Sequence, residues 1–260
     1  MHVTAQRFED IKWKRSFDEP EGINPHSPML AEVERLLTIS TPPSPLSGDL
    51  DMRQVYSIMV LCRCREMLRA VVLLTRHNML FVAAGLVRSI FESAATGVWL
   101  LEDEDHVNLF CADFLHNYGQ LVQSRPEFYG DEGWQTLLDD APFSVHKMPP
   151  LDNRLTPELE EHYVWYRDLC SRDHCSVSSI CQTMDVIEGK RYVRDTPPGW
   201  GVEQKHLGYA AMMTLHLATK VAIDCGFEGK DELATLGPRI NWLMQQWGPA
   251  SGAPRDGMQH

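Results

Sequence analysis

Basic residues are scarce in this chain of 260 residues: 24 Lys and Arg stand against 36 Asp and Glu, which gives a formal net charge of −12. Contacts to phosphate need Lys and Arg, so an acidic chain is a poor general binder of nucleic acid, although a local basic site is still open to it. The chain also lacks a phosphate-binding P-loop, a dinucleotide-binding Gly-x-Gly-x-x-Gly, a Gly-x-Ser-x-Gly elbow and a His-Glu-x-x-His motif. These absences count against the enzyme classes that the motifs mark.

An export signal is missing as well, because residues 1–15 are charged throughout. The cysteines number seven, an odd and scattered set that indicates reduced thiols rather than a disulfide framework. With 43% hydrophobic and 23% charged residues, the composition is that of a folded protein and excludes collagen and a disordered chain. We therefore expect a cytoplasmic protein.

The longest apolar stretch, residues 79–101, is long enough to cross a bilayer. Arg88 and Glu92 lie near its centre, however, where charge is costly in lipid. The stretch therefore predicts a buried helix of a bundle, and we expect no membrane partner.

Apolar residues at helical spacing predict the main helices over residues 28–39, 52–76, 79–102, 105–124, 156–174, 204–225 and 231–247. Ser27 is expected to cap the first of these helices, and Asp49 or Asp51 the second. Gly226 is expected to end the helix over 204–225, and Pro238 to bend or break the last one.

The weaker segments predict a short helix over 134–139, a further one within 176–189, and a loop over 191–201. No run alternates apolar and polar residues like a strand, and no repeat is present. The predicted fold is all-α: one bundle domain of about six or seven main helices over 28–247. A polar arm over 1–27 precedes it, and a flexible tail over 248–260 follows.

Large apolar side chains are assigned to the core of this bundle. Phe114 is one of them on the helix over 105–124, and Trp99, Trp165, Trp242 and Trp247 are others. Twelve Met and seven Trp would also allow a small apolar ligand to lie between the helices.

Two segments carry residues with chemical potential. Arg88 and Glu92 are four apart, so they share one helix face, and burial requires that they be paired. In the second segment, a spacing of seven residues is about 20° short of two helical turns. One stripe is therefore expected to hold Tyr163, Arg167, Cys170 and His174.

These segments resemble a group of uncharacterised bacterial helical proteins. Their shared pattern is an Arg-x-x-x-Glu helix, here Arg88 to Glu92, and a later Tyr-Arg-x-Leu-Cys-Ser-x-x-His segment, here 166–174. The matches fall between about residues 83 and 176. No assigned activity comes with this resemblance.

The second segment also resembles, more loosely, the signature of HEPN domains, helical domains often found in toxins and phage-defence ribonucleases. That resemblance implies that Arg167 and His174 are catalytic: the His acts as acid or base on the ribose 2′-hydroxyl, and the Arg steadies the phosphate. It further implies a homodimer that combines its two motifs, an RNA substrate and no metal. Imidazole and guanidinium suit those tasks at neutral pH.

The same residues allow a structural interpretation. Arg88 and Glu92 are then a buried pair, Arg167 pairs with Glu92 or a neighbouring acid, and His174 packs at a helix end. In that case the chain is a non-catalytic binding or interaction module, with Arg88, Glu92 and Tyr163 as its candidate binding residues.

A third interpretation is a di-iron oxygenase, since helical bundles hold such centres with Glu-x-x-His motifs. It requires carboxylates and imidazoles to converge, drawn from Glu92, Asp113, His116, Glu203 and His206. Only Glu203 and His206 form the complete motif, so the sequence assigns neither a metal site nor a cofactor.

Overall fold

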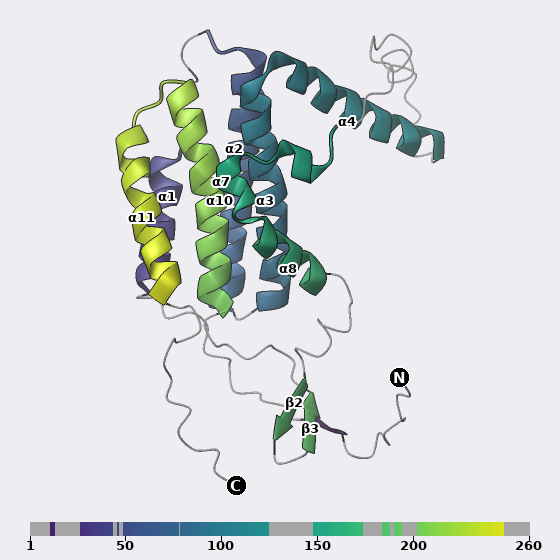
Figure 1. The fold of residues 1–260 in the computed structure, drawn as a ribbon, viewed down its shortest axis with the longest axis vertical. Coiled ribbons are helices and arrows are strands. Elements are labelled where there is room, and N and C mark those ends of the chain that lie inside the picture. The colour runs from purple at the N-terminus through teal and green to yellow at the C-terminus, as the bar shows by residue number, and fades with distance from the viewer. Residues whose placement is uncertain are drawn as a thin grey trace.

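The chain is described here from a computed structural model, over residues 11–13, 27–43, 46, 49–77, 79–124, 148–173, 184–187, 190–193 and 202–246. This part of the chain forms an all-α bundle, which confirms the predicted fold class (Figure 1). The main helices are α1 (Pro28–Ile39), α2 (Met52–Arg76), α3 (Leu80–Glu102), α4 (Glu104–Ser124), α8 (Tyr163–Asp173), α10 (Val202–Asp224) and α11 (Lys230–Gln246).

The bundle is centred on α2, α3 and α10, which lie side by side and pack most extensively on one another (Figure 1). On one side α10 is flanked by α1 and α11, while α4 extends away from the end of α3. On the other side α8 packs across α3. The segment that carries the Tyr-Arg-x-Leu-Cys motif is therefore seated on the predicted central helix.

Small residues let the central helices approach closely. A side chain at Gly97 of α3 would place its Cβ 2.7 Å from Leu217 Cδ1 of α10 and 3.1 Å from Val60 Cγ1 of α2. Ala94 and Ala95 on the same helix are fully buried. The apolar stretch is thus a core helix, and no helix in the described part of the chain is long and apolar enough to span a membrane.

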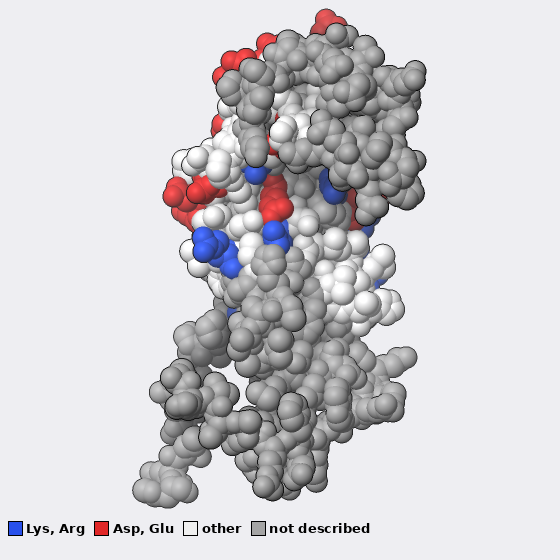
Figure 2. All heavy atoms as spheres, turned by 90° about the vertical axis from the view of Figure 1, so that its right-hand side faces the viewer, with Lys and Arg blue, Asp and Glu red and all other residues white. Residues whose placement is uncertain are grey.

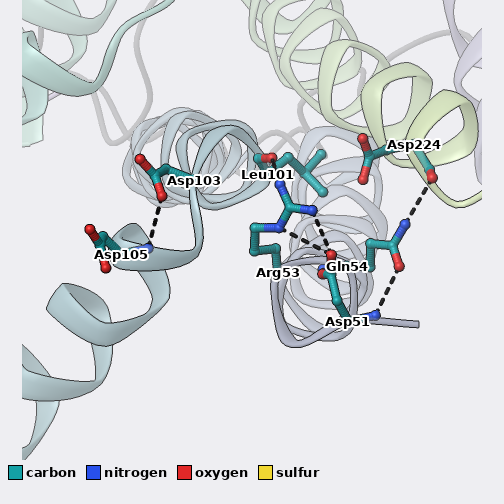
Figure 3. A network of polar contacts seen from close by, with 7 residues as sticks. All are labelled: Asp51, Arg53, Gln54, Leu101, Asp103, Asp105 and Asp224. Carbon is teal, nitrogen blue, oxygen red and sulfur yellow. Dashed lines mark hydrogen bonds and ion pairs between the residues drawn. The ribbon is translucent and has the colours of Figure 1, made fainter. Parts of the chain in front are cut away.

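The start of α2 is tied to the ends of two other helices (Figure 3). Asp51 Oδ1 accepts a hydrogen bond from Gln54 N, and Gln54 Oε1 accepts one from Asp51 N, both at 3.0 Å. Gln54 Nε2 also donates to Asp224 O at 2.9 Å, and Arg53 Nη1 donates to Leu101 O at 3.2 Å. Asp51 rather than Asp49 is therefore the cap, in a capping box.

Two of the predicted helix boundaries need correction. The helix expected over 156–174 is divided by a turn at 161–162 into α7 (Pro157–Glu160) and α8. In contrast, α11 continues through Pro238, which excludes the break and leaves the alternative of a bend as a prediction. Gly226, with a φ of 67°, has the left-handed conformation expected after α10.

A small sheet accompanies the bundle, contrary to the expectation of no strands. It consists of β1 (Ile11–Trp13), β2 (Met184–Ile187) and β3 (Lys190–Val193), with β3 in the middle, parallel to β1 and antiparallel to β2. The predicted helix within 176–189 and loop over 191–201 are therefore wrong at 184–187 and at 191–193. Strands of three or four residues are too short to show a two-residue period.

The expected core is correct in part. Trp99 is buried, but Phe114, Trp165 and Trp242 are exposed, because each lies on a helix at the edge of the bundle with one face covered. Trp247, the short helix expected over 134–139 and the tail over 248–260 lie outside the described residues.

Candidate functional site

The Glu92 carboxylate is the polar centre of the contact between α3 and α8. The Tyr166 hydroxyl donates to Glu92 Oε1 at 2.8 Å, and Arg88 Nε donates to the same oxygen at 3.1 Å. The Tyr166 ring stacks on Phe91 with 5.0 Å between centroids, and on Tyr163 with 5.5 Å. These contacts fix α8 on α3, and they confirm the predicted pairing of Arg88 with Glu92.

The protonation of this cluster follows from its surroundings. Burial alone would lower the pKa of Arg88, but the hydrogen bond and charge of Glu92 raise it above the ordinary value. Burial raises the pKa of Tyr166, and its hydrogen bonds to Cys170 and Glu92 raise it further. At neutral pH Arg88 is therefore a cation, and the Tyr166 hydroxyl is a proton donor to the carboxylate rather than a phenolate.

A second guanidinium reaches the same face of α3 from η2 (Leu151–Arg154). Arg154 Nη1 donates to Thr96 Oγ1 at 2.6 Å, and Thr96 Oγ1 donates in turn to Glu92 O at 2.8 Å. Burial lowers the pKa of Arg154, and the charge of Glu92 acts against that shift. Arg154 Nε is buried without a hydrogen-bond partner. The Glu92 carboxylate thus lies near two guanidinium groups, Arg88 on α3 and Arg154 on η2.

Arg167 is not part of this network. Its side chain is exposed, whereas Tyr163, Tyr166 and Cys170 on the same helix are half-buried. Of the two predicted partners of Arg167, Glu92 is wrong, because no ion pair joins them and Glu92 is bound by Arg88 and Tyr166. Pairing with a neighbouring acid stays a prediction. Arg167 lies about 100° round the helix from Tyr166, at the solvent edge of the predicted stripe. No hydrogen bond or ion pair to its guanidinium is found within the described ranges.

His174 follows the last residue of α8 and lies outside the described residues. The predicted partnership of Arg167 with His174 therefore stays a prediction.

Charges of both signs are interleaved on the face that Figure 2 shows. Lys and Arg lie beside Asp and Glu in its centre, so the described residues visible there do not form a continuous basic patch. Any phosphate-binding site on this face would be a local one.

Four of the five residues of the di-iron interpretation have described side chains, and these four form no metal-binding group within the described ranges. No group of three or more His, Cys, Asp or Glu is placed there to hold a metal ion. Glu92 is bound to Arg88 and Tyr166, and His206 is buried in α10. Asp113 and His116 lie on α4, and the Glu203 side chain is outside the description.

Two residues of the cluster, Thr96 and Arg154, were missed from the sequence, and Tyr166 was noted only as the first residue of the motif over 166–174. A signal for Tyr166 was present, since it lies three residues after Tyr163 and so shares a helix face with it. Arg154 had no such signal, because its partner Thr96 is 58 positions earlier in the chain.

No protein-family model, curated protein or solved structure matches this chain. A function can therefore be inferred only from the geometry of the site and from the residue pattern of α8.

Proposed function

We propose that this chain is a HEPN-like, metal-independent ribonuclease, of the kind used in toxin or defence systems, with Arg167 and His174 as its catalytic residues. The observation that carries the proposal is the exposure of Arg167 on a helix that is otherwise anchored. Tyr166, the residue before it, is bound to Glu92 and stacked on Phe91. The guanidinium is therefore presented to solvent from a fixed base, as a phosphate ligand requires.

The proposed chemistry uses groups of this chain alone. His174 takes the proton from a ribose 2′-hydroxyl, the 2′-oxygen attacks the phosphorus, and the bond to the 5′-oxygen breaks. A second His174 in a homodimer protonates the leaving 5′-oxygen. Arg167 binds the phosphate oxygens through two parallel N–H groups and stabilises the charge that develops on them.

In this proposal Arg88, Glu92 and Tyr163 position the catalytic helix and do not touch RNA. They set the angle at which α8 leaves the bundle, and hence where Arg167 points. A cytoplasmic location and a dimer belong to the same proposal, since RNA is an intracellular substrate and each chain supplies one motif.

The test is cleavage of end-labelled RNA by the purified chain in EDTA. We expect cleavage by the wild type with 2′,3′-cyclic phosphate ends, and none by His174→Ala or Arg167→Ala at equal folded concentration. RNA with a 2′-deoxy residue at the cleaved position should resist. Equal cleavage by wild type and His174→Ala, or no cleavage of any RNA by the wild type, would overturn the proposal.

A second candidate is a non-catalytic interaction module, which the satisfied Glu92 network and the interleaved charges of Figure 2 favour. It predicts that Arg167 contacts a partner without chemistry. RNA that is bound but left intact in the same assay, with weaker binding by Arg167→Ala, would support this candidate.

A further inference from the structure

An open groove of about 850 Å³ lies along α2, away from α8 and its motif. Its apolar lining comes from Tyr56, Met59 and Val60 of α2 and from Phe110 of α4. Pro42, Pro43 and Leu46 line it as well. Met59 is 60% exposed, which is unusual for a large apolar side chain. The volume is that of a small-molecule site, and its walls are mostly apolar.

Arg65 also lines this groove and is only 6% exposed. Its Nη2 donates to Leu37 O at 2.8 Å and to Thr41 Oγ1 at 2.5 Å, both of which are uncharged acceptors. Its Nε is buried and has no hydrogen-bond partner. Within the described ranges no carboxylate forms an ion pair with it.

A buried guanidinium without a counterion is costly, because the cation loses its hydration and gains no opposite charge in return. Burial and the nearby charge of Arg69 lower the pKa of Arg65, and the Cys62 thiol beside it acts against that shift, yet a guanidinium remains protonated in proteins. Arg63, also on the groove, adds a second positive charge in a chain whose net charge is −12. Glu66 lines the groove too but forms no ion pair with Arg65.

We propose that the groove binds a small amphipathic anion, a carboxylate with an unbranched apolar chain. Its head group accepts hydrogen bonds from Arg65, and its chain lies along Met59, Val60 and Phe110. Charge complementarity favours this occupant, because an anion would neutralise a buried guanidinium that has no carboxylate partner, and a hydrocarbon chain would cover the apolar lining. This site does not depend on the proposed ribonuclease activity. The sequence allowed for a small apolar ligand, and in this proposal that ligand carries a carboxylate.

The test is calorimetric titration of the full chain with decanoate below its micellar concentration, beside decanol and acetate as probes that lack the charge or the chain. We expect decanoate to bind at least about tenfold more tightly than decanol, because a charge-assisted hydrogen bond is lost with the alcohol. Acetate should not bind measurably. Equal affinity for decanol and decanoate, or no decanoate binding, would overturn the proposal.

Variants separate the two halves of the site. Arg65→Met should abolish the preference for decanoate over decanol. Because Arg65 is buried, its substitution can also disturb the fold, so two variants at the exposed Met59 give a second test. Met59→Glu places a charge on the groove that repels a carboxylate, and Met59→Lys places the opposite charge at the same position. We expect at least about tenfold weaker decanoate binding for Met59→Glu than for Met59→Lys. Equal affinities of these two variants would contradict the proposal.

Discussion

At the level of single residues, Glu92 matters because one of its oxygens accepts two hydrogen bonds, one from Arg88 on the same helix and one from Tyr166 that joins α3 to α8. Tyr166→Phe removes one of them and leaves the stacking on Phe91 in place. We expect it to lower the free energy of unfolding by about 1 kcal/mol, the usual net value of such a bond. Urea denaturation measures this loss.

The matched control is Tyr163→Phe, because Tyr163 contributes its ring rather than a hydroxyl bond to Glu92. It should leave the stability within about 0.5 kcal/mol of the wild type. Equal losses from the two changes would show that the Tyr166–Glu92 bond does not stabilise the docking of α8.

His162 and His216 make the stability of the fold depend on pH. Both line a hollow of about 290 Å³, together with Glu158 and Glu161. Burial lowers the pKa of both imidazoles below the ordinary 6.5, and Lys220 lowers that of His216 further. The unfolded chain therefore binds protons at a higher pH than the folded chain. Their contribution to stability is complete above 6.5 and is lost as the pH falls below it.

We expect His216→Gln to lose less stability than the wild type between about pH 7.5 and pH 5.5, because one buried imidazole no longer takes up a proton on unfolding. Urea denaturation at each pH gives the slope. His77→Gln, at an exposed position, should keep the wild-type slope. A slope unchanged by His216→Gln would rule out His216 as the titrating group.

At the level of elements, a capping box formed by Asp51 holds the N-terminus of α2. From the sequence, either Asp49 or Asp51 could have been the cap. Asp51→Ala removes an acceptor for Gln54 N and a partner of Arg53. We expect a loss of about 1 kcal/mol in the free energy of unfolding, the typical value of a cap. Asp49→Ala should change it by less than about 0.5 kcal/mol. Thermal or urea denaturation distinguishes the two, and a larger loss from Asp49→Ala would contradict the assignment.

Much at this level could be predicted from the sequence. α1 and α2 begin and end where their helical spacing placed them, because that signal is local. Ser27 precedes α1 as expected, but its side chain forms no capping hydrogen bond. The strands could not be predicted, because β1 pairs with a segment far along the chain, Ile11 with Arg191, and neither segment is long enough to show a period.

At the level of the whole molecule, the all-α class followed from the helical patterns, whereas the site followed only in part. Arg88 and Glu92 are neighbours on one helix, so their pairing could be predicted from spacing. Their meeting with Tyr166 and the nearby Arg154 depends on how α3, α8 and η2 pack, which no local pattern encodes. The burial of Arg65 was missed for the same reason, since its acceptors lie on α1 and just after it.

Because α8 is packed on α3, Arg167 presents an exposed guanidinium from a fixed helix. The most direct measurement is the rate of RNA cleavage in EDTA by Arg167→Ala, compared with Arg35→Ala on α1, which removes an exposed Arg elsewhere. We expect the rate to fall at least about a hundredfold for Arg167→Ala, since this change removes charge stabilisation of the transition state. Arg35→Ala should stay within about twofold of the wild type. Equal rates for the two variants would contradict the account.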